Sequence, residues 1–240
     1  MANLALIIAG GRGNRMGQDL PKQFLSVEDK PIIAYTLEAF QNHPEIDGIG
    51  VVCIPGWETV MEAYANQFNI TKLVGICAGG ANGNESIGNG LDMLESKFSD
   101  KDLVFVHDAV RPMVSEEVIS DCIHVTQEKG NAITIIPTAE ALLGTTDQET
   151  SLSVIDRSTT KRTQTPQGFV IGDLQKMHKE AAQRGITDPV ASCTLAIELG
   201  IPVNFSQGSE KNIKLTTVED IDIFKALLHA KRSEWLKSSR

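Results

Sequence analysis

The sequence is short of the features that mark secreted, membrane-spanning and nucleic-acid-binding proteins. Its four cysteines lie inside apolar segments without C-x-x-C or metal-site spacing, which favours buried free thiols in a reducing compartment. No apolar run is long enough to cross a membrane, and glycines begin at residue 10, too early for a signal peptide. A net charge of −9 argues against a nucleic-acid surface. We therefore expect a cytoplasmic protein that binds neither nucleic acid nor membrane.

Linkers and internal repeats are also absent. The 240 residues, of which 41% are hydrophobic, suffice for one core, so we expect a single domain over residues 1–240. Short apolar segments alternate with helical patterns, which predicts an α/β fold, a Rossmann-like three-layer sandwich with a mostly parallel sheet. The expected strands are 4–9, 48–54, 72–77, 102–107, 132–136, 169–170, 203–205 and 213–215. The expected helices are 31–42, 57–68, 85–98, 115–129, 173–184, 191–199 and 218–235.

The alternation stops between Pro137 and Gln164. This segment is polar, rich in Thr and Ser, and contains a Gly-Thr-Thr-Asp turn signal. We interpret residues 138–163 as a β-hairpin arm that is inserted in the domain and projects from it. Extended arms commonly pack against a second subunit, so the arm predicts a homodimer.

The first strand runs into a loop that is rich in glycine and in cations. Glycines there allow backbone N–H groups to converge on a phosphate. A dinucleotide site relies mainly on backbone amides, so the cations Arg12, Arg15 and Lys22 indicate a more highly charged ligand, such as a nucleoside triphosphate. A second glycine-rich turn, 79–84, also follows a strand. Both loops are therefore expected at the same edge of the parallel sheet.

Three other readings of these motifs are disfavoured. The G-x-G-x-x-x-G spacing from Gly11 departs from the dinucleotide fingerprint, and no acid follows the second strand. A P-loop kinase needs Gly-Lys-Ser/Thr at the end of the loop, and the sequence has none. His107 and Asp108 are adjacent in a strand and point to opposite faces, so His107 is interpreted as a structural histidine and not as part of a catalytic dyad.

Six separated blocks carry a resemblance to a known family. They are AGGRGNRMG at 9–17, PKQF at 21–24, HDAVRP at 107–112, Asp156-Arg157, QTPQ at 164–167 and NIKLTT at 212–217. In this order they resemble the alditol-phosphate cytidylyltransferases, which include the 2-C-methyl-D-erythritol 4-phosphate and ribitol-5-phosphate cytidylyltransferases. The resemblance implies that CTP and an alditol phosphate react to give a CDP-alditol and pyrophosphate, with Mg²⁺ on the phosphates of CTP.

The resemblance also implies roles for individual residues. The implied catalytic residues are Arg15, Lys22, Arg157 and Lys214. The nucleotide would lie against Ile8, Ala9, Gly10, Gly11, Gly13, Gly79, Gly80, Ala81, Asn82 and Ser86. The acceptor would contact Asp108, Arg111, Thr165 and Thr187. Asp108 is also the candidate metal ligand, and the other metal ligands stay open. Arg157 would come from the arm of the second subunit, so the homodimer would share its active sites.

The chain departs from the family at three places near the acceptor. Gly83 stands where many members have arginine, Glu140-Ala141 replaces the Asp-Thr of the methylerythritol enzymes, and Pro189–Ser192 lies in a lengthened segment. The Ala-Gly-Gly at 9–11, Val110 and Trp57 resemble the ribitol branch. The favoured acceptor is therefore ribitol 5-phosphate, which would serve a cell-wall polymer. The alternative is methylerythritol phosphate, for isoprenoid biosynthesis.

Two further hypotheses remain open. A sugar-1-phosphate nucleotidyltransferase also has a glycine-rich loop with arginine and a later Pro-Lys, but its gap is generally longer than Met16–Leu20. A paralogue that binds nucleotide without turnover would explain Gly83 and Ala141. Nucleotide preference tests the first hypothesis, and turnover tests the second.

Overall fold

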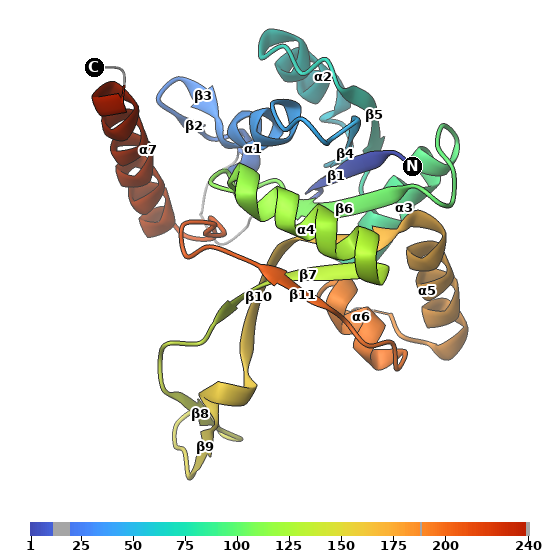
Figure 1. The fold of residues 1–240 in the computed structure, drawn as a ribbon, viewed down its shortest axis with the longest axis vertical. Helices are drawn as coiled ribbons and strands as arrows, with labels where there is room; N and C mark the ends of the chain where they lie inside the picture. The colour runs from blue at the N-terminus through green and yellow to red at the C-terminus, as the bar shows by residue number, and fades with distance from the viewer. Residues whose placement is uncertain (12–19, 188, 239–240) are drawn as a thin grey trace.

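A computed structural model of the chain describes residues 1–11, 20–187 and 189–238, and its described part is built around a seven-stranded sheet (Figure 1). The strand order is β11-β7-β10-β6-β1-β4-β5. All neighbours are parallel except β10, which runs antiparallel to both β6 and β7. The strands are β1 (Asn3–Ala9), β4 (Gly48–Cys53), β5 (Leu73–Ala78), β6 (Leu103–Asp108), β7 (Asn131–Pro137), β10 (Lys161–Val170) and β11 (Phe205–Gln207).

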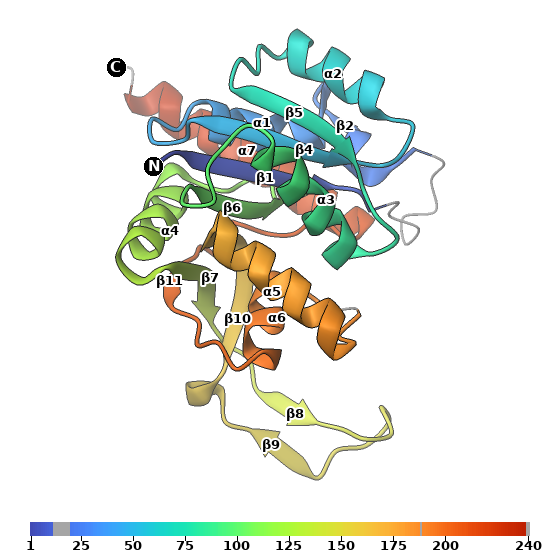
Figure 2. The same ribbon diagram turned by 90° about the vertical axis from the view of Figure 1, so that its right-hand side faces the viewer.

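Helices cover both faces of the sheet, which confirms the predicted three-layer α/β architecture (Figure 2). One face carries α1 (Ile32–Gln41), α2 (Glu58–Gln67) and α4 (Glu116–Lys129). The other carries α3 (Gly83–Glu95), α5 (Ile171–Arg184) and α6 (Ser192–Glu198). Among residues 1–11, 20–187 and 189–238, no helix combines the length and the apolar character needed to cross a bilayer.

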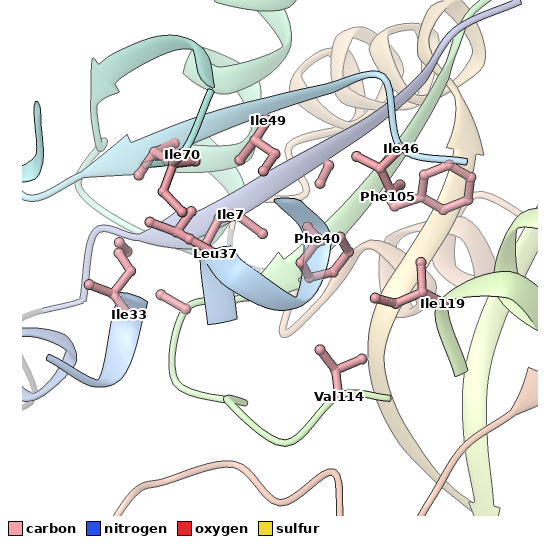
Figure 3. Packing of buried hydrophobic residues seen from close by; sticks show 14 of the residues in the cluster. Ile7, Ile33, Leu37, Phe40, Ile46, Ile49, Ile70, Phe105, Val114 and Ile119 are labelled. Atoms are coloured by element: carbon pink, nitrogen blue, oxygen red, sulfur yellow. The ribbon is translucent and has the colours of Figure 1, made fainter. Parts of the chain in front are cut away.

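Strand β1 shows how the sequence builds the two cores. Successive side chains of a strand point to opposite faces. Ile7 therefore packs with Leu37 and Phe40 in the first core (Figure 3), whereas Leu4 and Leu6 are buried in the second. An unbroken apolar run such as this one is typical of a central parallel strand that is covered on both sides.

A third, smaller core joins the C-terminal helix α7 (Val218–Ser238) to the hairpin of β2 (Ser26–Val27) and β3 (Lys30–Pro31). Phe224 of α7 packs edge-on against Tyr35, with ring centroids 5.2 Å apart. The same core holds Val110 and Leu215, and the amide of Leu215 donates to the carbonyl of Val110 at 2.9 Å. This contact brings residue 214 next to the end of β6.

The predicted hairpin arm is present, but residues 161–163, expected at its end, already pair with β7 as the start of β10. β8 (Leu142–Gly144) and β9 (Ser153–Ile155) form an antiparallel pair that extends away from the sheet (Figures 1 and 2). The short 3₁₀ helix η3 (Arg157–Thr159) follows β9 and leads into β10.

Three predicted elements need correction. The strand expected at 169–170 is the end of the ten-residue β10, whose polar start hides it from a hydrophobicity pattern although Gln164 and Gln167 are buried. The strand expected at 203–205 is β11, at 205–207. Residues 213–215 form no strand, since they leave the sheet to pack under α7.

Candidate functional site

A cavity of about 610 Å³ lies over the carboxyl ends of β1 and β6, where open α/β sheets bind ligands. Its lining comes from segments that are far apart in the sequence. These are residues 8–11, 22–23, Pro55, 80–84, 86–87, 106–110, Thr165, Gln167, 189–192 and Lys214.

Gln23 anchors the part of the cavity that follows β1. Its Nε2 donates to the carbonyl oxygens of Ala9 at 2.6 Å and of Gly11 at 3.1 Å, and its side chain is buried. These bonds tie η2 (Lys22–Phe24) to the end of the strand. Lys22, one residue earlier, lines the cavity as a result.

The turn that precedes α3 lies against the end of β1 because both segments lack side chains there. An added Cβ on Gly10 would lie 3.3 Å from Ser86 Oγ and 3.6 Å from Gly79 Cα. Ser86 Oγ accepts from the Gly80 amide at 3.1 Å and donates to the Asn82 carbonyl at 2.8 Å. Close backbone approach and a fixed turn are what a nucleotide cradle needs.

Gly83, the first residue of α3, also lines this side of the cavity. An added Cβ there would meet no atom within 4 Å. The turn therefore has room at the position where the resemblance led us to expect an arginine side chain.

Asp108 holds two cations at the end of β6. Its Oδ2 accepts from Arg111 Nε and its Oδ1 from Lys214 Nζ, both at 2.9 Å. Burial raises the pKa of this carboxyl, but the charges of Lys214 and Arg111 outweigh burial and hold the pKa below its usual range. Asp108 is therefore an anion, and the cluster of three side chains carries a net charge of about +1 at neutral pH.

The hydrogen bonds of His107 define its tautomer. The amide of Asp108 donates to Thr165 Oγ1 at 3.1 Å, so the Thr165 hydroxyl is free to donate to His107 Nδ1 at 3.0 Å. The Nε2 proton of His107 then points to the carbonyl of Arg111 at 3.3 Å. Full burial lowers the pKa of His107 to about 3, so the ring is neutral. His107 thus positions Thr165 and is the structural histidine that its place in the strand predicted.

The implied site residues fall into four groups. Most of them meet at the cavity: Ile8, Ala9, Gly10, Gly11, Lys22, Gly80, Ala81, Asn82, Ser86, Asp108, Thr165 and Lys214 line it, Gly79 packs against Gly10 and Ser86, and Arg111 donates to Asp108. Thr187 is exposed at the rim, where its carbonyl accepts from Asn82 Nδ2 at 3.2 Å. Arg157 lies on the arm, outside the lining, with Nη1 donating to the Ala139 carbonyl at 2.8 Å. Arg15 and Gly13 lie outside the described residues.

The sequence interpretation assigned no role to Gln23, Gln167 or Ser192. Gln23 and Gln167 belong to the quoted PKQF and QTPQ blocks, but a polar residue in a loop or a strand carries no signal that it will be buried. Ser192 begins a helix whose contact with the cavity depends on tertiary packing. Ala141, the second departure from the family, is exposed on the arm and does not reach this cavity.

The cavity offers little to hold a metal by itself. Within the described ranges no three His, Cys, Asp or Glu side chains form a metal-binding group. Asp108 is the one acidic residue among the described lining residues, and both its oxygens contact cations. A metal ion here would therefore have to bring most of its ligands with it, because the described lining offers at most one carboxylate.

Comparisons with known proteins give consistent matches. Residues 3–230 match the family IspD, 2-C-methyl-D-erythritol 4-phosphate cytidylyltransferase. The chain is 42% identical to the ribitol-5-phosphate cytidylyltransferase of Lacticaseibacillus paracasei, covering 95% of this chain and 98% of that protein. It is 35% identical to the 2-C-methyl-D-erythritol 4-phosphate cytidylyltransferase of Desulforamulus reducens, covering 98% and 99%. The crystal structure of the Francisella tularensis 2-C-methyl-D-erythritol 4-phosphate cytidylyltransferase matches with a TM-score of 0.75 and 27% identity, covering 93% and 98%.

Proposed function

The chain belongs to the 2-C-methyl-D-erythritol 4-phosphate cytidylyltransferase family, and from that premise we propose that it transfers the CMP moiety of CTP to ribitol 5-phosphate and releases pyrophosphate. Family membership makes it a nucleotidyltransferase. The proposal adds the acceptor, the residues that act and the assembly in which they act.

One observation carries the proposal: Lys22 and Lys214, 192 positions apart in the sequence, line the same cavity together with the glycine turn 80–84. The protein as a whole has a net charge of −9, so this local concentration of cations is an exception. Two anionic substrates that must meet need such a place, because fixed positive charges offset their mutual repulsion.

The chemistry needs no general base. The attacking atom is a phosphate oxygen of the acceptor, which is already ionised at neutral pH, so catalysis reduces to alignment and charge stabilisation. Lys22, and Arg15 by family resemblance, would stabilise the charge that builds on the α-phosphate of CTP. Lys214, held by Asp108, would bind the acceptor phosphate. Bound Mg²⁺ would neutralise charge on the triphosphate, with Asp108 as its candidate protein ligand.

The acceptor assignment rests on sequence identity to relatives and on the packing of Trp57 beneath η2. The ribitol relative matches at 42% identity and the methylerythritol relative at 35%. Trp57, a residue that resembles the ribitol branch, stacks on Phe24 with centroids 4.7 Å and planes 11° apart. This stack supports η2, which carries Lys22, so Trp57 belongs to the packing under the site. Methylerythritol phosphate stays the alternative acceptor.

The arm supports the proposal of a homodimer with shared sites. Leu143, Leu152 and Val154 are exposed on it, Val154 to 78%, although arms in water normally present polar side chains. A second subunit would cover them and would receive Arg157 at its own cavity. We assign the chain, as one nucleotidyltransferase domain with this arm, to the cytoplasm, where CTP is available, and to the synthesis of a cell-wall polymer.

The experiment that tests the reaction class is pyrophosphate release by the purified protein with Mg²⁺ and ribitol 5-phosphate, with CTP, UTP or dTTP as the nucleotide. We expect release with CTP at a kcat/KM at least tenfold above that with the other two. A preference for UTP or dTTP would favour a sugar-1-phosphate nucleotidyltransferase. Binding of CTP without turnover on any alditol phosphate would favour the inactive paralogue.

A further inference from the structure

One side of the cavity is formed by Pro189–Ser192, hereafter the wall. The wall is uncharged, and Val190 is 93% exposed on it while Pro189 is buried. Phosphates bind to cations and N–H groups, and no side chain of the wall carries either. Its apolar and hydroxyl groups suit instead the hydroxylated carbon chain of the acceptor.

Ser192 gives the wall an unused polar group. Ser192 is 3% exposed, and its hydroxyl has no hydrogen-bond partner in the part of the chain that the structure describes. Buried hydroxyls are normally paired, so an unpaired one in the lining of a cavity points to a ligand that completes it.

The C-terminal end of the wall is held by Gln167 of β10. Its Oε1 accepts from the Cys193 amide at 3.1 Å, and its Nε2 donates to Cys193 Sγ at 3.4 Å. Gln167 is itself buried in the sheet, so this end of the wall has a rigid support.

The N-terminal end of the wall is held by Asn82 of the glycine-rich turn 79–84. This turn is called the nucleotide turn below, because the proposed function places CTP against it. Asn82 Nδ2 donates to the Thr187 carbonyl at 3.2 Å, two residues before the wall begins. The other atom of the same amide, Oδ1, caps α3 by accepting from the Glu85 amide at 2.8 Å. One side chain therefore connects the nucleotide turn to the wall, and its two functions reside on two different atoms.

We propose that Asn82 is a positioning residue for the acceptor: it holds the wall, and with it Ser192, at the distance from the nucleotide turn that the polyol chain requires. This inference rests on the proposed function. It predicts that a residue of the nucleotide turn affects recognition of the other substrate.

The substitution Asn82→Ser separates the two functions. Serine is as good a helix N-cap as asparagine, so α3 keeps its cap, but the serine side chain has no Nδ2 to reach Thr187. Asn89→Ser is the matched control, because Asn89 lies on the same helix and its Nδ2 also donates to a backbone carbonyl, that of Ala78 at 3.0 Å, outside the cavity lining.

In steady-state kinetics we expect Asn82→Ser to raise the KM for ribitol 5-phosphate by about three- to tenfold, the range for one lost hydrogen bond. The KM for CTP should rise by a smaller factor than the KM for ribitol 5-phosphate, because serine keeps the cap that shapes the turn. Asn89→Ser should leave both KM values unchanged. A rise in the KM for CTP alone, or no change in either KM, would overturn the inference.

Amide hydrogen exchange tests the inference without turnover. In Asn82→Ser, a peptide that spans 187–195 should exchange about three- to tenfold faster than in the unmodified protein, whereas peptides of α3 should not change. Unchanged exchange in 187–195 would contradict the role of Asn82. If the unmodified protein turns over no alditol phosphate, the proposed function fails, and the exchange experiment still decides whether Asn82 holds the wall.

Discussion

At the scale of single residues, the cavity separates groups that carry charge from groups that orient them. Asp108 is held as an anion by Lys214 and Arg111, and it fixes the position of both cations. His107 is neutral and fixes Thr165. The ion-paired groups therefore place fixed charges at the end of β6, whereas the neutral histidine contributes order and no charge.

The protonation state of His107 can be measured directly. Because burial lowers its pKa to about 3, the ring should stay neutral, with its proton on Nε2, from pH 8 to about pH 4. Ring ¹⁵N chemical shifts from NMR would show this. A titration near the unperturbed pKa of about 6.5 would contradict the assignment.

The same pKa has a consequence for stability. The unfolded chain protonates this histidine below about pH 6.5 and the folded chain only near pH 3, so the free energy of unfolding should fall as the pH drops through that window. Denaturation of His107→Gln at several pH values should show a shallower dependence than the unmodified protein.

Lys22 is predicted to act on the transition state. Lys22→Ala should lower kcat by about 10²- to 10³-fold, as the loss of one electrostatic donor does in other enzymes, and should raise the KM for CTP much less. Lys176→Ala, which removes an exposed lysine on α5, is the control for a general change in charge. An effect on KM alone would show that Lys22 only binds the nucleotide.

At the scale of elements, periodicity in the sequence predicted the strands and helices that have apolar faces and missed those that do not. β1, β4 and β6 are buried on both sides, and their apolar runs identified them. The polar start of β10 and the two-residue strands β2 and β3 have no such pattern. Their place in the fold depends on partners distant in sequence, which no local pattern encodes.

The candidate site was predictable to a similar extent. The sequence blocks led to Lys22, Asp108, Thr165 and Lys214, which the fold brings to one cavity. The sequence did not predict the supporting residues Gln23 and Gln167. They act by hydrogen bonding to backbone groups of distant segments, the carbonyl of Ala9 and the amide of Cys193. Local sequence can identify a functional group but not the hydrogen bonds that hold it.

Gln23 tests how η2 is attached to β1. Gln23→Ala leaves the buried carbonyl of Ala9 without its donor, and the expected loss is about 1–3 kcal/mol in the free energy of unfolding. Urea denaturation measures this loss, with Gln127→Ala, an exposed position on α4, as a control that should change stability by less than about 0.5 kcal/mol. Equal stability of the two variants would show that water replaces the Gln23 amide.

At the scale of the whole molecule, the arm and the cavity lie on different parts of one chain, and the proposed dimer joins them. Mixed dimers of Lys22→Ala and Arg157→Ala would contain one intact site each, because the two substitutions fall together in the other site. Random mixing should therefore restore about a quarter of the unmodified activity. Activity that stays at the level of the separate variants would exclude a shared site.

The comparison of acceptors tests the central claim most directly. The measurement is kcat/KM for pyrophosphate release from CTP and Mg²⁺, with ribitol 5-phosphate and 2-C-methyl-D-erythritol 4-phosphate supplied separately. We predict a value for ribitol 5-phosphate at least about 10²-fold higher, since a site built to hydrogen-bond a polyol discriminates strongly against an analogue with fewer matching hydroxyls. A higher value for methylerythritol phosphate would contradict the account and would assign the chain to isoprenoid biosynthesis.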